Sequence, residues 1–288
     1  MLVNLDAVLL PAQKKHYGVG LFNAVNLEMT NGIMDAAESL KAPVIMGTAE
    51  ILLGAADLRE VAAMVKARAE LSDIPVVLHY DHGLTFEKCM EAIKAGFTSV
   101  MYDCSTLPYE ENVRKVAQMV EIAHAFGVTV EGELGHVGDN EGAGKLETPS
   151  DYYTVPSIAA DYVKRTHVDA LAIAVGNAHG DYKFPPMLDF DRISEIAEAV
   201  DVPLVLHGGS GLSDEDFREA IERGIAKINI FTDINKAQVK GMQEALKAGV
   251  NNAFDMAPYE VSAIRQVVEE KMRLFKSAGK AYSYSQQT

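Results

Sequence analysis

Cysteine is scarce in this sequence, which argues against a fold held together by disulfide bonds. The 288 residues include two cysteines, Cys89 and Cys104, and neither belongs to a C-x-x-C pair. Isolated thiols of this kind are typical of the reducing cytoplasm, which is the location we expect. The N-terminal residues carry no basic group ahead of their apolar run, so no signal peptide is predicted.

Long apolar runs and positive charge are also in short supply. No stretch reaches the length and apolarity of a membrane span. Asp and Glu total 41 against 26 Lys and Arg, which gives a formal net charge of -15. This charge argues against nucleic acid or an anionic membrane as a partner. It also requires that any anionic substrate be held by local positive groups rather than by the overall field.

The apolar residues that are present suffice for a large core, and they fall into short runs separated by helical patterns. Hydrophobic residues make up 48% of the chain. Eight runs predict strands, and they start at Val19, Pro43, Ile74, Ser99, Val128, Ala170, Pro203 and Ala226. Apolar residues at three- and four-residue spacing predict helices at residues 55–69, 85–95, 110–126, 189–199 and 213–223.

Strands that alternate with helices predict βαβ units and a parallel sheet. Eight such units fit a TIM (β/α)8 barrel, and an open, doubly wound sheet is the structural alternative. No G-x-G-x-x-G opens a first helix, which weakens the dinucleotide-binding form of that alternative. A helical pattern over residues 259–275 predicts an additional C-terminal helix that closes the barrel or packs on a partner. We find no repeat or linker and predict a single domain over residues 1–288.

Polar residues follow directly on six of the predicted strands. The third strand runs through V-V-L-H-Y-D-H-G and therefore ends in Asp81 and His82. The other five end in Asp103, in Glu131 and Glu133, and in the runs G-N-A-H-G, L-H-G-G-S-G and N-I-F-T-D. In a TIM barrel the catalytic groups lie at the C-terminal ends of the strands. The sequence therefore predicts one reactive site at that end of the barrel.

Three histidines, His82, His179 and His207, follow three different strands. Three neutral imidazoles on rigid elements, with one position left open, form the donor set of catalytic zinc. A single buried histidine is more often a satisfied structural residue, so it is the joint pattern that favours a metal site. His79 alternates away from His82 along the strand, and we assign it to packing or to support of the site.

Glycine-rich turns follow two of these histidines. Gly180 follows the histidine of the sixth strand, and G-G-S-G, which begins at Gly208, follows that of the seventh. Glycine lets backbone N–H groups approach an anion closely, and Ser210 adds a hydroxyl donor. Barrels often bind phosphate after the seventh and eighth strands, where residues 229–232 lie. Ordinary turn glycines are the alternative, but beside a zinc site phosphate binding is favoured.

A long glycine-rich segment, G-H-V-G-D-N-E-G-A-G-K, follows the fifth strand at residues 135–145. It carries Asp139 and Glu141. A loop of this kind can close over a substrate and bring one carboxylate to it. A solvated acidic turn is the alternative on these residues alone.

Taken in order, these motifs resemble those of the class II, zinc-dependent ketose-bisphosphate aldolases, in the branch of the fructose- and tagatose-bisphosphate enzymes. The shared motifs are D-H-G at Asp81, E-G-E-L-G at Glu131, G-N-A-H-G at Gly176, L-H-G-G-S-G at Leu206 and K-I-N-I-x-T-D at Lys227. The resemblance spans nearly the whole chain. It implies a TIM barrel and an aldehyde-lyase, assembled as a homodimer or homotetramer. Its substrate would be fructose or tagatose 1,6-bisphosphate, cleaved to dihydroxyacetone phosphate and glyceraldehyde 3-phosphate.

The resemblance also implies a metal site. His82, His179 and His207 would bind Zn2+ at the end of the barrel. Asp103 would match a position linked to an alternative location of the metal, and Glu133 would support the site from behind.

Further roles that the resemblance implies concern the substrate. Asp81 would exchange the proton of the C4 hydroxyl, and Glu141 would be a second proton-transfer carboxylate. The residues implied to line the C1 phosphate are Gly180, Lys183, Gly208, Ser210, Asn229 and Thr232. A monovalent cation, Na+ or K+, near that phosphate is a further feature of the family.

Two departures from the family pattern concern the aldehyde half of the substrate. Phe231 stands where many relatives have Asp, Asn or Ala, and D-M-A-P-Y at residues 255–259 lacks an arginine often found there. Such an arginine can help to hold a second phosphate, and Arg265 is a candidate replacement. We carry three hypotheses: a bisphosphate aldolase, an aldolase for another ketose 1-phosphate with a non-phosphorylated or acidic distal end, and a non-catalytic metal- or sugar-phosphate-binding barrel.

Overall fold

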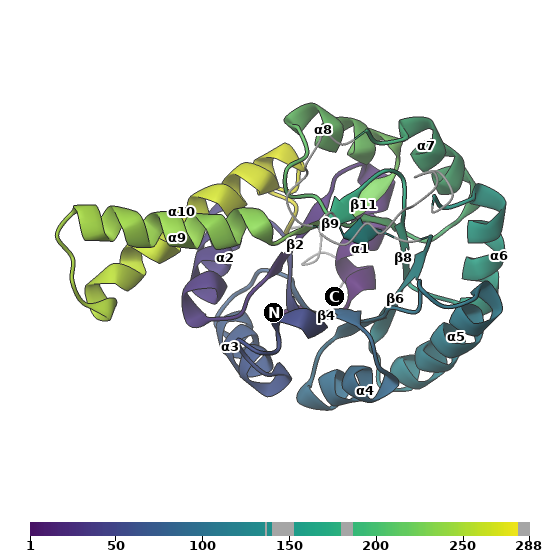
Figure 1. Cartoon of the computed structure of the whole chain (residues 1–288), viewed down its shortest axis with the longest axis horizontal. Coiled ribbons are helices and arrows are strands. Elements are labelled where there is room, and N and C mark those ends of the chain that lie inside the picture. The colour runs from purple at the N-terminus through teal and green to yellow at the C-terminus, as the bar shows by residue number, and fades with distance from the viewer. Residues whose placement is uncertain (136, 140–152, 180–186, 282–288) are drawn as a thin grey trace.

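The computed structural model describes residues 1–135, 137–139, 153–179 and 187–281. Within these residues, eight parallel strands close into a barrel surrounded by helices (Figure 1). The strands pair in the order β2-β3-β4-β5-β6-β8-β10-β11, and β11 returns to pair with β2. Their bounds are β2 (Val19–Asn23), β3 (Val44–Ala49), β4 (Val76–Gly83), β5 (Ser99–Tyr102), β6 (Thr129–Leu134), β8 (Ala170–Ile173), β10 (Leu204–Leu206) and β11 (Ile225–Ile230). The predicted TIM barrel is confirmed, and each predicted run overlaps one of its strands.

The helices on the outside of the barrel begin at caps that the sequence supplies. Asp57 accepts from the backbone of Glu60 at the start of α3, and Ser213 accepts from Asp216 at the start of α8. The bounds are α2 (Leu27–Leu40), α3 (Leu58–Glu70), α4 (Phe86–Ala95), α5 (Tyr109–Ala125), α6 (Pro156–Thr166), α7 (Phe190–Ala199) and α8 (Asp214–Arg223), with a short 3-10 turn η1 (Glu50–Leu52). Their apolar faces bury the outer surface of the strands.

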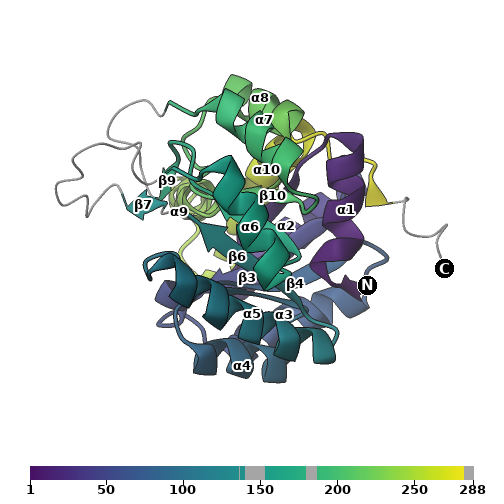
Figure 2. The ribbon, with the colours of Figure 1, turned by 90° about the vertical axis from the view of Figure 1, so that its right-hand side faces the viewer.

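An N-terminal helix closes the bottom of the barrel. Leu5, Val8 and Leu9 of α1 (Leu5–Lys15) pack with inward-facing strand residues such as Leu21 and Val77, all of them fully buried. The short β1 (Leu2–Val3) precedes this helix and pairs with β4. Figure 2 shows α1 at one end of the barrel and the paired strands β7 (Gly138–Asp139) and β9 (Ala178–His179) at the other. The lower interior is therefore apolar, and polar groups can gather only toward the upper end.

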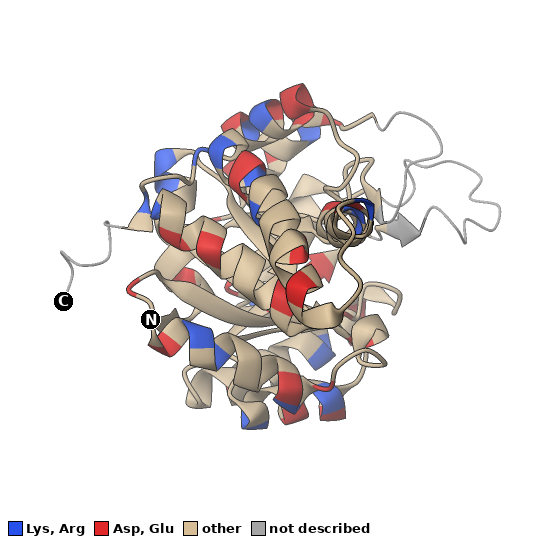
Figure 3. Cartoon of the chain, turned by 90° about the vertical axis from the view of Figure 1, so that its left-hand side faces the viewer, with Lys and Arg blue, Asp and Glu red and all other residues tan. Residues whose placement is uncertain are grey.

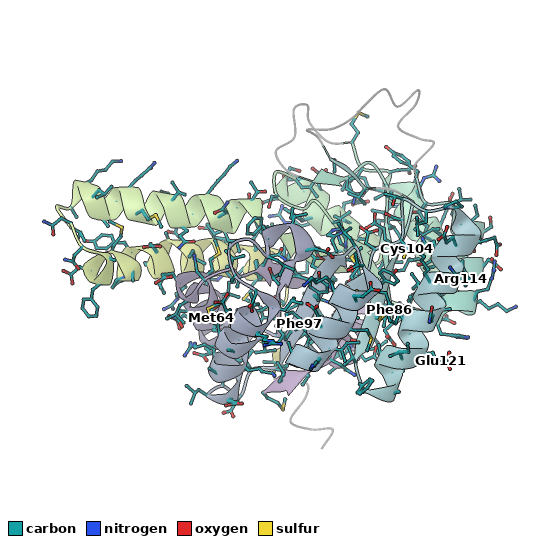
Figure 4. The ribbon with its side chains drawn as sticks, turned by 60° about the horizontal axis from the view of Figure 1, so that its bottom comes forward. Met64, Phe86, Phe97, Cys104, Arg114 and Glu121 are labelled. Carbon is teal, nitrogen blue, oxygen red and sulfur yellow. The ribbon has the colours of Figure 1, made fainter. Side chains whose placement is uncertain are left out.

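Two C-terminal helices project from the side of the barrel as an antiparallel pair (Figures 1 and 4). They are α9 (Thr232–Lys247) and α10 (Ala253–Leu274), and α10 also packs on α2. The predicted C-terminal helix is present, although it begins six residues earlier than residue 259. Phe254 near the turn between the two helices is 88% exposed.

Charged side chains cover the outer helices. Lys and Arg are interspersed with Asp and Glu on the side that Figure 3 shows. Arg114 and Glu121 lie on the outward face of α5, whereas Cys104 is buried nearer the ends of the strands (Figure 4). No helix among the described residues is long and apolar enough to cross a membrane.

Close approach of β3 and β4 beneath the upper end of the barrel requires glycine at position 47. Gly47 is paired with His79, and a Cβ at position 47 would overlap the carbonyl oxygen of His79. We expect Gly47→Ala to force the strands apart and to lower the free energy of unfolding by about 3 kcal/mol. Gly54→Ala is the control, because Gly54 is exposed and nothing lies within 4 Å of its added methyl. Urea unfolding measures both, and equal stabilities of the two variants would contradict this packing.

Candidate active site

The site begins at the C-terminal end of β4, where Asp81 and His82 are adjacent in sequence. Side chains alternate along a strand, so such neighbours normally face opposite sides of the sheet. Here the pairing with β5 shifts register between Tyr80 and Gly83, and His82 has a left-handed backbone conformation with φ of 44°. Because of this irregularity, Asp81 and His82 both line the same cavity. Tyr80 packs outward in the core beneath the helices.

Two imidazole rings at this site are anchored by carboxylates: that of His82, which lines the cavity, and that of His207, which is fully buried. His82 Nδ1 donates to Asp103 Oδ2 at 2.9 Å, and His207 Nε2 donates to Glu131 Oε1 at 2.8 Å. An ionised carboxylate only accepts, so each of these ring nitrogens carries a proton. The opposite nitrogens, His82 Nε2 and His207 Nδ1, lie 2.7 Å apart. The two anchors therefore direct one nitrogen of each ring toward the same point.

The charges around this point favour a cation. Burial opposes ionisation of His82, but the charge of Asp81 and the hydrogen bond to Asp103 raise its pKa to about 10. These surroundings stabilise a positive charge at the ring nitrogens. A proton between the two rings supplies such a charge, and a divalent metal ion would supply it as well. Ligand atoms of Asp81, His82 and His207 all lie within 4.8 Å of one another. Histidines backed by carboxylates are typical of zinc sites, so this donor set fits zinc.

Asp81 is held as an ionised carboxylate that faces the cavity. Its side chain accepts from Asn229 Nδ2 at 3.0 Å and from Asn23 Nδ2 at 3.3 Å. Burial would raise the pKa of Asp81, but the positive charges of His82 and Lys227 outweigh it and hold this pKa well below its ordinary value. An ionised and oriented carboxylate beside a metal site can accept a proton from a bound substrate.

Asp103 and Glu133 lie close to His82 and form a second possible ligand set with it. Burial, and then the charge of Asp103, raises the pKa of Glu133 to about 8. Burial opposes ionisation of Asp103 as well, but hydrogen bonds from His82 and Ser105 hold its pKa well below the ordinary value. Near neutral pH, Glu133 is therefore the protonated carboxyl group and Asp103 the ionised one.

The catalytic candidates line a cavity of about 420 Å³ that has a polar part and an apolar part. The polar part includes the turn after β10 and the first residue of α9, namely Gly208, Gly209, Ser210 and Thr232. The apolar part consists of Ala49, Ile51, Leu52, Leu84, Val137 and Phe231. None of the described residues that line this cavity is Lys or Arg. A larger cavity of about 550 Å³, lined by Tyr109 and Tyr153 among others, contains none of the predicted site residues.

The turn after β10 combines a packing constraint with donors for an anion. Gly208 has φ of 65°, and a Cβ there would overlap the carbonyl oxygen of Ala178, so the fold itself requires this glycine. The N-cap residue of α9, Phe231, supplies no side-chain bond to the helix, and Ser210 Oγ accepts from the N–H of Asp233 at 3.4 Å. The N-terminus of a 16-residue helix beside this turn favours negative charge.

The predicted residues that lie outside the described part of the chain are Glu141, Gly180 and Lys183. For His179 the backbone is described, and it lies in β9 beside Asp139 of β7. Asn177 Nδ2 donates to the carbonyl oxygen of His207 at 3.1 Å. This bond ties the segment that leads to His179 to the end of β10, where His207 lies.

Three buried residues that support the site had no predicted role. Asn23 orients Asp81, Glu131 anchors His207, and Lys227 Nζ lies 2.7 Å from Glu131 Oε2. Strand alternation could have revealed two of them. Glu131 faces the same side of its strand as Glu133, and Lys227 faces the same side as Asn229.

Comparison with known proteins agrees with this geometry. The family model for class-II fructose-bisphosphate aldolase matches residues 3–280. A fructose-bisphosphate aldolase of Geobacillus stearothermophilus is 44% identical, over 97% of this chain and 99% of its own. A probable fructose-bisphosphate aldolase of Bacillus subtilis is 43% identical over the same shares. The crystal structure of the YdjI aldolase of Escherichia coli K12 superposes with a TM-score of 0.88 at 37% identity, covering 98% of this chain and 100% of that one.

The barrel is thus that of a class-II aldolase. The chain belongs to the class-II fructose-bisphosphate aldolase family and is an aldehyde-lyase.

The raised pKa of Glu133 predicts a pH-dependent stability of the metal-depleted protein. The pKa is about 8 in the folded protein against 4.5 ordinarily, so the folded state binds the extra proton between these values. The contribution of Glu133 to the free energy of unfolding therefore falls as pH rises from 4.5 to 8, by up to about 1.4 kcal/mol per pH unit. In urea unfolding between pH 5 and pH 8, Glu133→Gln should remove this contribution and shift the slope of the free energy of unfolding against pH toward more positive values, whereas the exposed control Glu87→Gln should keep the slope of the unmodified protein. Equal slopes for Glu133→Gln and the unmodified protein would refute the assignment.

Proposed function

We propose that this protein is a zinc-dependent aldolase that reversibly cleaves a ketose 1-phosphate between C3 and C4, releasing dihydroxyacetone phosphate and an aldehyde. The observation that carries the proposal is the meeting of three features around one cavity. These are the ionised Asp81, the facing nitrogens of His82 and His207, and the turn that begins at Gly208. A base, a metal site and an anion site are the three parts that this reaction needs.

The residues divide the chemistry between them. Zinc, held by His82, His207 and His179, supplies a Lewis acid for the negative charge that develops on the enediolate. Asp81 accepts the proton of the C4 hydroxyl as the bond between C3 and C4 breaks. Asn23 and Asn229 fix the orientation of Asp81 for this transfer. In the reverse direction the same carboxylate returns the proton.

The phosphate end of the substrate is assigned to the polar part of the cavity. Gly208, Ser210 and Thr232 line this part, and the N-terminus of α9 adds favourable backbone dipoles. The remaining residues that we assign to the phosphate are Gly180, Lys183 and Asn229, with a monovalent cation nearby. Asn229 also bonds to Asp81, so this residue would connect the phosphate end with the reacting end. Glu141 is the proposed carboxylate for the second proton transfer.

Two kinds of aldehyde half are candidates. The names of the relatives favour a fructose bisphosphate. Fructose 1,6-bisphosphate and tagatose 1,6-bisphosphate both give glyceraldehyde 3-phosphate as the aldehyde. The lining of the cavity favours a ketose 1-phosphate without a distal phosphate, because Ile51, Leu84 and Phe231 offer no charge to bind one. Arg265, the candidate replacement for the missing arginine, does not line the cavity. It bonds instead to Glu269 and to Ser39.

A non-catalytic sugar-phosphate-binding barrel is the weaker alternative. Binding alone would not need a buried carboxylate that stays ionised beside two histidines and is oriented by two amides.

Two further proposals concern the oligomeric state of the enzyme and its location in the cell. We propose a homodimer or homotetramer, with the exposed apolar residues of α9 and α10 such as Phe254 and Leu246 as candidate contacts. We also propose the cytoplasm, which agrees with two free, buried cysteines.

Replacement of the proposed base should separate catalysis from metal binding. We expect Asp81→Ala to retain zinc and to lose cleavage activity by about 10²- to 10⁴-fold, because proton transfer loses its acceptor. His207→Ala should instead lose zinc, since one ring of the facing pair is removed. Metal analysis and a coupled assay for dihydroxyacetone phosphate measure both variants. Undiminished cleavage by Asp81→Ala would remove its role as base, and full zinc in His207→Ala would remove that residue from the ligand set.

A panel of substrates tests the proposed reaction and its aldehyde half together. The panel contains fructose 1,6-bisphosphate, tagatose 1,6-bisphosphate and several ketose 1-phosphates, each assayed with and without a chelator. We expect release of dihydroxyacetone phosphate from at least one of them, and loss of this release with the chelator. Cleavage of monophosphates alone would select the second candidate. If zinc-loaded protein releases nothing from any substrate, the binding-protein alternative is favoured and the proposed activity is wrong.

A further inference from the structure

A buried ion pair lies inside the barrel beneath the proposed zinc site. Lys227 on β11 and Glu131 on β6 are both fully buried, and Lys227 Nζ lies 2.7 Å from Glu131 Oε2. Their angles are not those of a hydrogen bond, so the contact is mainly electrostatic. Burying two charges is costly, and a good packing of apolar residues in their place is often as stable. The pair therefore calls for a role beyond stability.

The two oxygens of Glu131 have different partners. Oε1 accepts from His207 Nε2 at 2.8 Å, and Oε2 faces the ammonium group of Lys227. His79 Nε2 is the next polar atom near Oε2, at 3.8 Å, which is too far for a hydrogen bond. A continuous chain of contacts thus runs from Lys227 through Glu131 to His207 and ends at His207 Nδ1, which faces His82.

A direct chemical role for Lys227 does not fit its position. A lysine that forms a Schiff base must reach the carbonyl carbon of the substrate. Lys227 is fully buried, does not line the cavity that holds Asp81 and His82, and is paired with a carboxylate. Besides the effect of its charge on Asp81, its contacts connect Lys227 to the site through Glu131.

We propose that Lys227 is a positioning residue that keeps His207 in its metal-binding tautomer. By pairing with one oxygen of Glu131, the ammonium group leaves the other oxygen to accept from His207 Nε2. The proton of the ring then stays on Nε2, and Nδ1 faces His82. This inference rests on the proposed zinc site and adds a residue that acts two contacts away from the metal.

Donor and acceptor rules give this role an unusual signature. In Glu131→Gln, the ammonium group of Lys227 can only donate, so it attracts the carbonyl oxygen of the new amide. The amide NH2 group then faces His207 Nε2, which must accept, and the ring proton moves to Nδ1. In the double variant Lys227→Met/Glu131→Gln, this constraint is absent. The amide can turn its oxygen to His207 and its NH2 group to His79 Nε2.

The test is the dissociation constant for Zn2+, measured by competition with a chromophoric chelator. We expect Glu131→Gln to weaken zinc binding by about 100-fold and the double variant to lie within about 10-fold of the unmodified protein. Removing the second charge of the pair should thus restore the zinc affinity that removal of the first charge reduced. The control is Lys66→Met, which removes a lysine that donates to Ala95 outside the barrel and should leave zinc binding unchanged.

Circular dichroism of the metal-free variants establishes that each is folded. If the double variant does not fold, 15N spectra of the histidines in metal-free Glu131→Gln test the inference instead. In this variant the inference places the ring proton of His207 on Nδ1. A proton found on Nε2 would overturn it. Equal losses of zinc affinity in the single and double variants would also overturn it, while the zinc site would stand. An unmodified protein that binds no zinc would overturn the proposed function, and this inference with it.

Discussion

The upper end of this barrel depends on two imidazole rings that are each held from behind by a carboxylate. Asp103 fixes one ring and Glu131 the other, and both bonds point a nitrogen at the same place. Neither ring could be aimed in this way by its own backbone, because a histidine side chain rotates about two bonds. The carboxylates therefore determine which nitrogen faces the cavity, and the remaining parts of the site are arranged around that choice.

The barrel supports this arrangement in successive levels. At the bottom, α1 and small apolar side chains exclude water. Above them lie the buried charges of Glu131 and Lys227, which cannot be solvated and so must satisfy each other. Above these, Asp81 and His82 line the cavity, and His207 is buried against His82. Packing at each level restricts the side-chain conformations of the level above it. The candidate catalytic residues are therefore supported by a rigid apolar core.

The sequence predicted most of the fold, because eight β-rich runs with helical patterns between them leave few arrangements. It also predicted that Asp81, His82 and His207 lie together at one end of the barrel, since these residues interrupt apolar strands. Two features were beyond its reach. The shift of register at His82 depends on the pairing with β5, which no local pattern encodes. The contact of Lys227 with Glu131 joins positions 96 residues apart on strands that are not neighbours. The order of the motifs also does not reveal the side-chain volumes in the cavity, such as that of Phe231, on which our proposal for the aldehyde half depends.

The most direct test of this account is a crystal structure of the zinc-loaded protein with anomalous data at the zinc edge. We predict one strong peak bonded to His82 Nε2 and His207 Nδ1, at about 2.0 to 2.1 Å from each nitrogen. Asp103 and Glu131 should keep their bonds to the opposite nitrogens. A peak bonded to His82 Nδ1 or His207 Nε2 would contradict the account, as would zinc bound away from this pair of rings.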